Sequence, residues 1–212
     1  MSKGKVLILT DSLGLARDTP EHVSYEDTWP SLVRKDGYYV HQVSIGGATS
    51  DFILKQIPYH KGFDPDIVIV QLGIVDCAPR FARKGEIEAL RKIPFLGNKI
   101  LGLLNKPFIR KRRRITYTSL SNFRKNVLAI KASFSVPVYF LTIVNASEGY
   151  EAMLSGITEN INNYNRIILE IADKKDISLT GIEKQGVMSD FHHLNKRGHS
   201  IVSSKVLRVL NA

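Results

Sequence analysis

The sequence KVLILTDSL at residues 5–13 joins a short apolar run to a polar Asp-Ser pair. A run of aliphatic and β-branched residues this short predicts a buried strand, and the change at Asp11 predicts the turn that ends it. Four more runs of the same kind follow along the chain. They predict strands at residues 39–45, 66–72, 137–144 and 177–180.

Segments with apolar residues at three- and four-residue spacing separate these runs. They predict helices at residues 29–35, 49–56, 119–134, 157–175 and 195–210. In the fourth helix, for example, Ile161, Tyr164 and Ile168 fall on one face. A chain that alternates strand and helix five times favours a parallel sheet with helices on both sides.

The composition bounds the class of protein. With 212 residues, 43% hydrophobic and 24% charged, the chain fits one globular domain spanning residues 1–212. The single cysteine, Cys77, excludes an intrachain disulfide. The first apolar run is shorter than a signal peptide requires, and no run approaches the roughly 18 apolar residues of a membrane span. We therefore expect a cytoplasmic protein.

The net charge of +10 is concentrated in one segment, residues 80–114, where twelve Lys and Arg face only two acids. This segment separates the third strand from its helix and combines an apolar run with Arg110–Arg114. We expect a lid-like insertion at about residues 80–115. The alternative is a pair of external helices whose basic residues are merely solvated. Arg110–Arg114 would suit an anionic carrier or membrane surface, whereas nucleic acid is disfavoured because no aromatic residues are interleaved.

Polar residues follow the predicted strands. In a parallel sheet, ligands bind beyond the carboxyl ends of the strands. The segments there are residues 10–13, 46–50, 73–76 and 189–195. They should meet at one edge of the sheet, and this is where we place the site.

Ser12, Asp190 and His193 are the residue types of a nucleophile, an orienting acid and a base. Ser12 could instead be a helix N-cap, and Asp190 and His193 could cap the last helix. A metal site of His192, His193 and His199 is disfavoured, because only one carboxylate is near and no helical histidine pair has the right spacing. We expect no metal and no cofactor.

These motifs resemble the SGNH/GDSL hydrolase family. Asp11-Ser12-Leu13 is similar to the G-D-S-L block, with Thr10 in place of the glycine, and Gly47-Ala-Thr-Ser to the second block. Asp190-Phe-His-His193 is similar to the D-x-x-H block. The resemblance implies a serine esterase with a three-layer α/β/α fold around a flavodoxin-like parallel sheet of about five strands.

The same resemblance implies roles for individual residues. Ser12 would be the nucleophile, His193 the base and Asp190 its orienting acid, with the backbone N–H groups of Ser12 and Gly47 in the oxyanion hole. The third block departs from the family pattern G-x-N-D, because Val75 replaces the asparagine donor. Losing one such donor lowers turnover by about 10²–10³-fold. We prefer Arg80 as the substitute donor.

Asn145 and Asn195 are alternative donors, because both lie near strand ends. Asp11, Asp76, Arg80 and Asn195 are the residues expected to contact substrate. Asp76 has two other interpretations: it could hold the neighbouring loop, or be a plain turn aspartate.

The predicted activity is hydrolysis of an O-acetyl carbohydrate ester on bacterial surface polysaccharide or a related sugar intermediate. A glycan or small-molecule ester is therefore the expected partner. The alternatives are a lysophospholipase or acyl-thioesterase, an acyltransferase, and a binding module whose catalysis Val75 has weakened.

Overall fold

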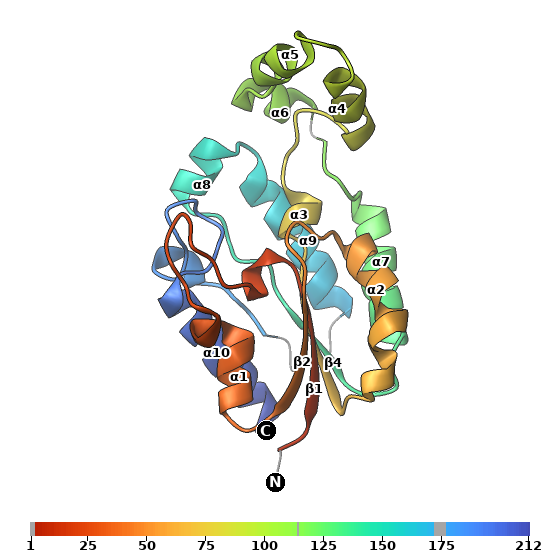
Figure 1. Ribbon diagram of the computed structural model, residues 1–212, viewed down its shortest axis with the longest axis vertical. Helices are drawn as coiled ribbons and strands as arrows, with labels where there is room; N and C mark the ends of the chain where they lie inside the picture. The colour runs from red at the N-terminus through yellow and green to blue at the C-terminus, as the bar shows by residue number, and fades with distance from the viewer. Residues whose placement is uncertain (1–2, 114, 172–176) are drawn as a thin grey trace.

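A four-stranded parallel sheet forms the centre of the protein. The computed structural model describes residues 3–113, 115–171 and 177–212 (Figure 1). The strands are β1 (Lys5–Thr10), β2 (Tyr39–Ser44), β3 (Ile67–Gln71) and β4 (Val138–Leu141), in the order β2-β1-β3-β4. All neighbouring strands are parallel. The predicted α/β architecture is therefore confirmed.

The fifth predicted strand, residues 177–180, is reduced to a single bridge in the described chain. Ile177 pairs in parallel with Leu141, and its carbonyl accepts from the Thr142 N–H at 3.1 Å. The ladder then stops, because the Leu179 N–H donates to the Thr142 side chain instead of to backbone. Side-chain hydrogen bonds of this kind compete with strand pairing. The expected sheet of about five strands is thus corrected to four among the described residues.

Helices cover both faces of the sheet. In Figure 1, α1 (Trp29–Lys35) and α10 (Lys196–Leu210) lie together on one side. On the other side α2 (Ser50–His60) contacts α7 (Leu120–Ala132), which in turn contacts α9 (Ile157–Ile171). The predicted continuation of α9 to residue 175 lies outside the described residues. The chain is completed by α3 (Ile74–Cys77), α8 (Glu148–Met153) and the short 3₁₀ helices η1 (Ser12–Gly14), η2 (Tyr25–Asp27), η3 (Lys61–Phe63) and η4 (Ile182–Lys184).

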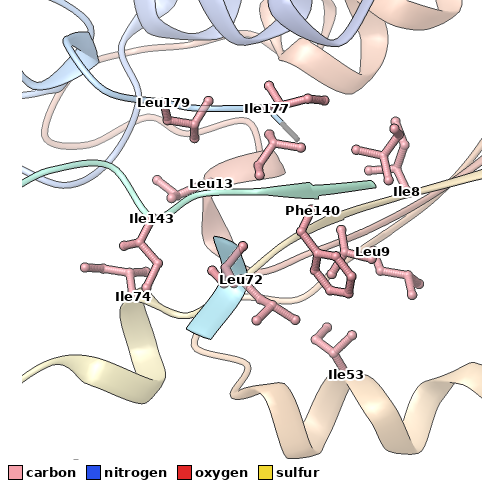
Figure 2. Close-up of a cluster of buried hydrophobic side chains, with 14 of the residues drawn as sticks. Ile8, Leu9, Leu13, Ile53, Leu72, Ile74, Phe140, Ile143, Ile177 and Leu179 are labelled. Atoms are coloured by element: carbon pink, nitrogen blue, oxygen red, sulfur yellow. The ribbon is translucent and has the colours of Figure 1, made fainter. Parts of the chain in front are cut away.

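The core fills the space between the sheet and both helical layers. Consecutive residues of β1, Ile8 and Leu9, are fully buried and point to opposite faces, as strand geometry requires. Figure 2 shows Ile53 of α2 near Leu9, with Leu179 on the opposite side of the strands. A central strand buried on both faces needs a continuous apolar run, which explains the sequence of β1.

The basic insertion forms three helices at the carboxyl end of the sheet. These are α4 (Lys84–Arg91), α5 (Gly97–Leu104) and α6 (Pro107–Arg113), drawn together above the body of the protein in Figure 1. An antiparallel bridge between Arg80 and Ile115 closes its base. Arg113 ties α6 to α4 through a two-point contact with Glu86, at 2.7 and 3.0 Å.

Arg114, part of the predicted basic run, lies outside the described residues. No helix in the described ranges is both long enough and apolar enough to cross a membrane.

Candidate active site

Ser12 stands directly beyond the end of the central strand. The Asp11 N–H still donates to Gln71 O of the neighbouring strand at 3.2 Å, so the parallel ladder extends up to this point. Asp11 then caps η1, its Oδ1 accepting from the Leu13 N–H at 3.0 Å. This turn leaves Ser12 half-buried at the carboxyl edge of the sheet, as the sequence predicted.

Ser12, His193 and Asp190 form one hydrogen-bonded chain. The Ser12 Oγ lies 3.1 Å from His193 Nε2, and His193 Nδ1 lies 2.6 Å from Asp190 Oδ2. The structure thus brings Ser12 together with His193, 181 positions later in the sequence, and with Asp190. This is the geometry by which a base removes the proton of a serine while a carboxylate fixes its tautomer.

The loop carrying Asp190 and His193 is held by its own backbone. The Met188 N–H donates to His193 O at 2.7 Å, and Phe191 takes a left-handed conformation with φ 66°. Asp190 Oδ1 accepts from the His192 and His193 N–H groups at 3.2 and 3.0 Å. One carboxylate oxygen therefore fixes the loop, and the other orients the imidazole.

The environment keeps His193 neutral. Burial is the main cause, the neighbouring His192 and the Arg17 charge add to it, and the contacts with Asp190 oppose it; together they lower the pKa of His193 to about 4. Burial disfavours ionisation of Asp190, but hydrogen bonds from His193 and His192 outweigh it and hold that pKa below its usual value. The pair is thus a neutral imidazole beside a carboxylate at neutral pH, which suits a general base.

Two backbone N–H groups near Ser12 are available to an oxyanion. The Ala48 N–H donates to Ile45 O at 3.2 Å, so residues 45–48 form a tight turn with Gly47 at a φ of 72°. This third turn position requires a positive φ, which glycine adopts without strain. Neither the Ser12 nor the Gly47 N–H donates to another residue in the described chain.

Val75 offers no third donor. It lies half-buried in α3, in the wall of the same pocket as Ser12 and Gly47. Gly73 starts this short helix with a φ of 117°, and a Cβ there would lie 2.7 Å from Ile143 Cδ1. The backbone of the third block is therefore built tightly around Gly73, while the side chain at position 75 presents only methyl groups.

A pocket of about 590 Å³ adjoins the Ser12–His193 pair. Arg80 lies in its wall, with its guanidinium carbon 4.3 Å from the centre of the Tyr117 ring. Besides the predicted residues, the pocket contains side chains that the sequence analysis did not assign to the site. These are Arg17, Ala78, Tyr117, Tyr150, Met153 and Leu154; His192, named above only as a metal-ligand alternative, lines it too.

A signal for several of these residues was present in the sequence. Tyr150, Met153 and Leu154 follow β4, so the strand-end rule would have found them had it been applied there. Tyr117 follows the insertion and meets Arg80 only because the Arg80–Ile115 bridge joins the two ends. Arg17 has no comparable signal.

Three residues expected to contact substrate do not line this pocket. Asp11 and Asp76 are fully buried, and Asp76 accepts from the Ser50 N–H at 3.0 Å and the Ser50 hydroxyl at 2.7 Å. Asn195 caps α10, accepting from the Gly198 N–H at 2.9 Å and donating to backbone carbonyls. Asp76 and Asn195 thus hold the scaffold, and Asp11 is buried beneath Ser12, so none of the three faces this pocket. Asn145, an alternative oxyanion donor, lines a different cavity.

Asp190, His192 and His193 each offer one possible metal-ligand atom, all within 4.8 Å of one another. Both ring nitrogens of His193 already contact Ser12 or Asp190, so a metal held by His193 would displace one of these contacts. His199, the third histidine of the metal alternative, accepts from the Trp29 N–H through Nδ1 at 3.1 Å and is buried in the scaffold.

A strand-end serine joined to a histidine and a carboxylate on a parallel α/β sheet defines a serine hydrolase. The chain belongs to the GDSL-like lipase/acylhydrolase family, whose model matches residues 11–201. It is an ester-hydrolysing enzyme of that family. The resemblance of the sequence motifs to the family is thereby confirmed.

Solved structures share the whole fold at low sequence identity. A lipase/acylhydrolase from Enterococcus faecalis has a TM-score of 0.66 at 17% identity, covering 98% of this chain and 94% of its own. A variant of Axe2, an acetyl xylan esterase from Geobacillus stearothermophilus, scores 0.63 at 17% identity, with coverages of 99% and 95%. TesA scores 0.59 at 16% identity, with 97% of each chain covered. No curated protein matches the sequence.

Proposed function

We propose that this protein is a carbohydrate O-acetyl esterase acting on bacterial surface polysaccharide or a related sugar intermediate, with Ser12 as its nucleophile. The observation that carries the reaction is the Ser12–His193–Asp190 chain at 3.1 and 2.6 Å. The observation that favours a sugar is the adjoining pocket, because Arg17, Arg80 and Tyr117 supply polar groups for hydroxyl-rich ligands.

The proposed reaction follows from these contacts. Ser12 Oγ attacks the acetyl carbonyl carbon while its proton passes to His193 Nε2. The oxyanion accepts hydrogen bonds from the Ser12 and Gly47 N–H groups, and its collapse expels the sugar alkoxide, which takes the proton from His193. Water then attacks the acetyl-serine with His193 again as base. Acetate leaves and Ser12 regains its proton.

Labelling with a fluorophosphonate probe, together with acetate release from an acetylated methyl glycoside, tests this proposal. Ser12→Ala should abolish labelling and lower turnover by about 10³-fold or more, because without the nucleophile only residual binding effects remain. Ser204→Ala is the matched control, since Ser204 is exposed on α10, far from β1 in sequence. Full acetate release by Ser12→Ala, at an unchanged unfolding temperature, would reject Ser12 as nucleophile.

One observation favours a second candidate, hydrolysis of longer acyl esters at an anionic membrane. The insertion exposes 95% of Phe95 and 69% of Leu103 and Phe108, beside its basic residues. Apolar side chains next to cations are typical of segments that lie on anionic lipid. A series of para-nitrophenyl esters from acetyl to decanoyl separates the two: the carbohydrate esterase should prefer acetyl, and the lipid esterase decanoyl in the presence of anionic vesicles.

A further inference from the structure

We propose that Arg80 binds an anionic group on the alcohol side of the substrate, so that the enzyme prefers acetyl esters of acidic or phosphorylated sugars to neutral ones. The inference rests on the proposed function and narrows it to a substrate class. Its basis is the charge and contacts of the pocket wall next to Ser12.

The wall of this pocket carries cations and no carboxylate among the described residues. These cations are Arg17 and Arg80. The acid of the site, Asp190, is held behind His193 by the imidazole and by backbone N–H groups. A cleft lined by one sign of charge attracts ligands of the opposite sign and raises their local concentration.

Neither arginine has a carboxylate partner in the described part of the chain. The Arg80 Nε is buried and makes no hydrogen bond there. A guanidinium that is partly withdrawn from water is stabilised by a hydrogen-bonded anion, and an unsatisfied buried donor is unfavourable. The Nε itself has no exposed surface, so the donors that Arg80 can offer a substrate anion are its terminal Nη groups, which make no hydrogen bond in the described chain.

The Tyr117 ring holds the Arg80 guanidinium in a defined place. The guanidinium carbon lies 4.3 Å from the ring centre, a distance typical of a cation–π contact. Stacking occupies a face of the planar group and leaves its N–H edges for ligands. Those edges match a carboxylate or phosphate with two parallel hydrogen bonds, which an ammonium group cannot reproduce.

The two arginines act on different parts of the site. The charge of Arg17 helps to lower the pKa of His193, so it lies on the catalytic side. Arg80 instead pairs with Ile115 at the base of the insertion and stacks on Tyr117 there, and its charge adds to the lowering that burial causes in the pKa of Arg110 in α6. Arg80 thus suits a group remote from the reacting carbonyl.

Three matched substrates test the proposal: an acetylated methyl glucoside, an acetylated glucuronate and an acetylated glucose phosphate. We expect the wild type to favour at least one anionic ester by about 10-fold in kcat/KM at low salt. Arg80→Gln should bring that ratio close to one, mainly by raising KM for the anionic ester. Arg80→Lys should keep part of the preference, because it retains the charge but loses the planar edge. The two anionic esters show whether a carboxylate or a phosphate is recognised.

Arg91→Gln is the matched control, because it removes one exposed cation from α4 and should leave the ratio unchanged. Equal kcat/KM of the wild type for all three esters would overturn the proposal. An equal fall in kcat for all three in Arg80→Gln would also overturn it, because that result places Arg80 at the oxyanion.

Calorimetric binding of glucuronate and glucose phosphate separates this proposal from the proposed function. Binding that Arg80→Gln weakens about 10-fold supports the anion site even if no acetyl sugar is hydrolysed. Binding that is equally strong in Arg80→Gln, or absent from the wild type, overturns the anion site and leaves esterase activity on neutral esters untouched.

Discussion

Replacing His192 with glutamine should move the acid limb of the pH–rate profile to higher pH. The His192 and His193 rings lie 3.8 Å apart between their centres, so charge on one opposes protonation of the other. After burial, His192 is the largest cause of the low pKa of His193. Removing its charge leaves burial and Arg17 to lower this pKa, with Asp190 still opposing them. The pKa should therefore rise from about 4 toward the ordinary 6.5.

The size of the effect follows from the fraction of neutral base. At about pH 5, a histidine with a pKa of about 4 is ~90% neutral, whereas one with a pKa of 6.5 is only ~3% neutral. The wild type should thus keep nearly full kcat/KM at this pH. His192→Gln should lose activity there by a factor that cannot exceed ~30, and recover it as the pH rises to neutrality.

The assay is kcat/KM on para-nitrophenyl acetate at low salt, between about pH 4 and pH 8, with folding checked by circular dichroism at each pH. The check matters because a histidine buried in its neutral form stabilises the fold less as the pH falls from 6.5 toward about 4. His199 behaves in the same way, since burial lowers its pKa to about 4 as well.

His22→Gln is the matched control. His22 is exposed and pairs with Asp18 at 3.1 Å, so its removal should leave the acid limb in place. Glutamine at position 192 also removes the stacking on Tyr150, at 5.6 Å between ring centres, and this can change the rate at every pH. For that reason the test compares the apparent pKa of the acid limb between wild type and His192→Gln, and not the absolute rates. A wild-type limb near 6.5, or a limb in His192→Gln that stays near 4, would refute the reasoning.

Two further substitutions test the buried Asp11 beneath Ser12 and Val75 in the pocket wall. Burial raises the pKa of Asp11 to about 7, so ionisation of this residue lowers stability as the pH rises from 3.8 to about 7. Asp11→Asn should therefore stabilise the protein by about 4 kcal/mol near pH 8 and by much less near pH 4, measured by urea unfolding. A smaller gain at the higher pH would contradict this assignment. Val75→Asn should raise kcat on an acetyl ester by about 10-fold, or about 1.4 kcal/mol, if the oxyanion hole lacks a donor, and should be neutral or harmful if another group already supplies one.

The strands of the sheet and the positions of Ser12, Asp190 and His193 could be predicted from the sequence, because both depend on short-range signals. Apolar runs predicted β1 to β4 to within three residues at each end, and the strand-end rule brought Ser12, Asp190 and His193 to one edge. The fifth strand failed for a local reason. Residues 177–180 have strand composition, yet the Thr142 hydroxyl takes the N–H that the ladder needed.

The burial of individual polar side chains could not be predicted from the motifs. Asp11 and Asp76 occupy family-like blocks and so appeared able to reach substrate, but whether a carboxylate faces the pocket or the scaffold depends on contacts across the fold. Asp76 reaches Ser50, 26 positions earlier, and is fully buried. The contact between Arg80 and Tyr117 likewise spans the whole insertion and has no periodic signal.

Val75 and the basic insertion, two features that the family resemblance did not predict, meet in the same pocket. Val75 lines it, and both ends of the insertion contribute to it through Arg80 and Tyr117. The bridge from Arg80 N to Ile115 O, at 2.8 Å, fixes these ends together. On the functions proposed above, the residues beyond β1 and in the loop before α10 would supply the chemistry, and the base of the insertion would contribute to substrate choice. An apolar side chain at position 75 and a strongly basic insertion are then compatible with the complete Ser12–His193–Asp190 hydrogen-bonded chain.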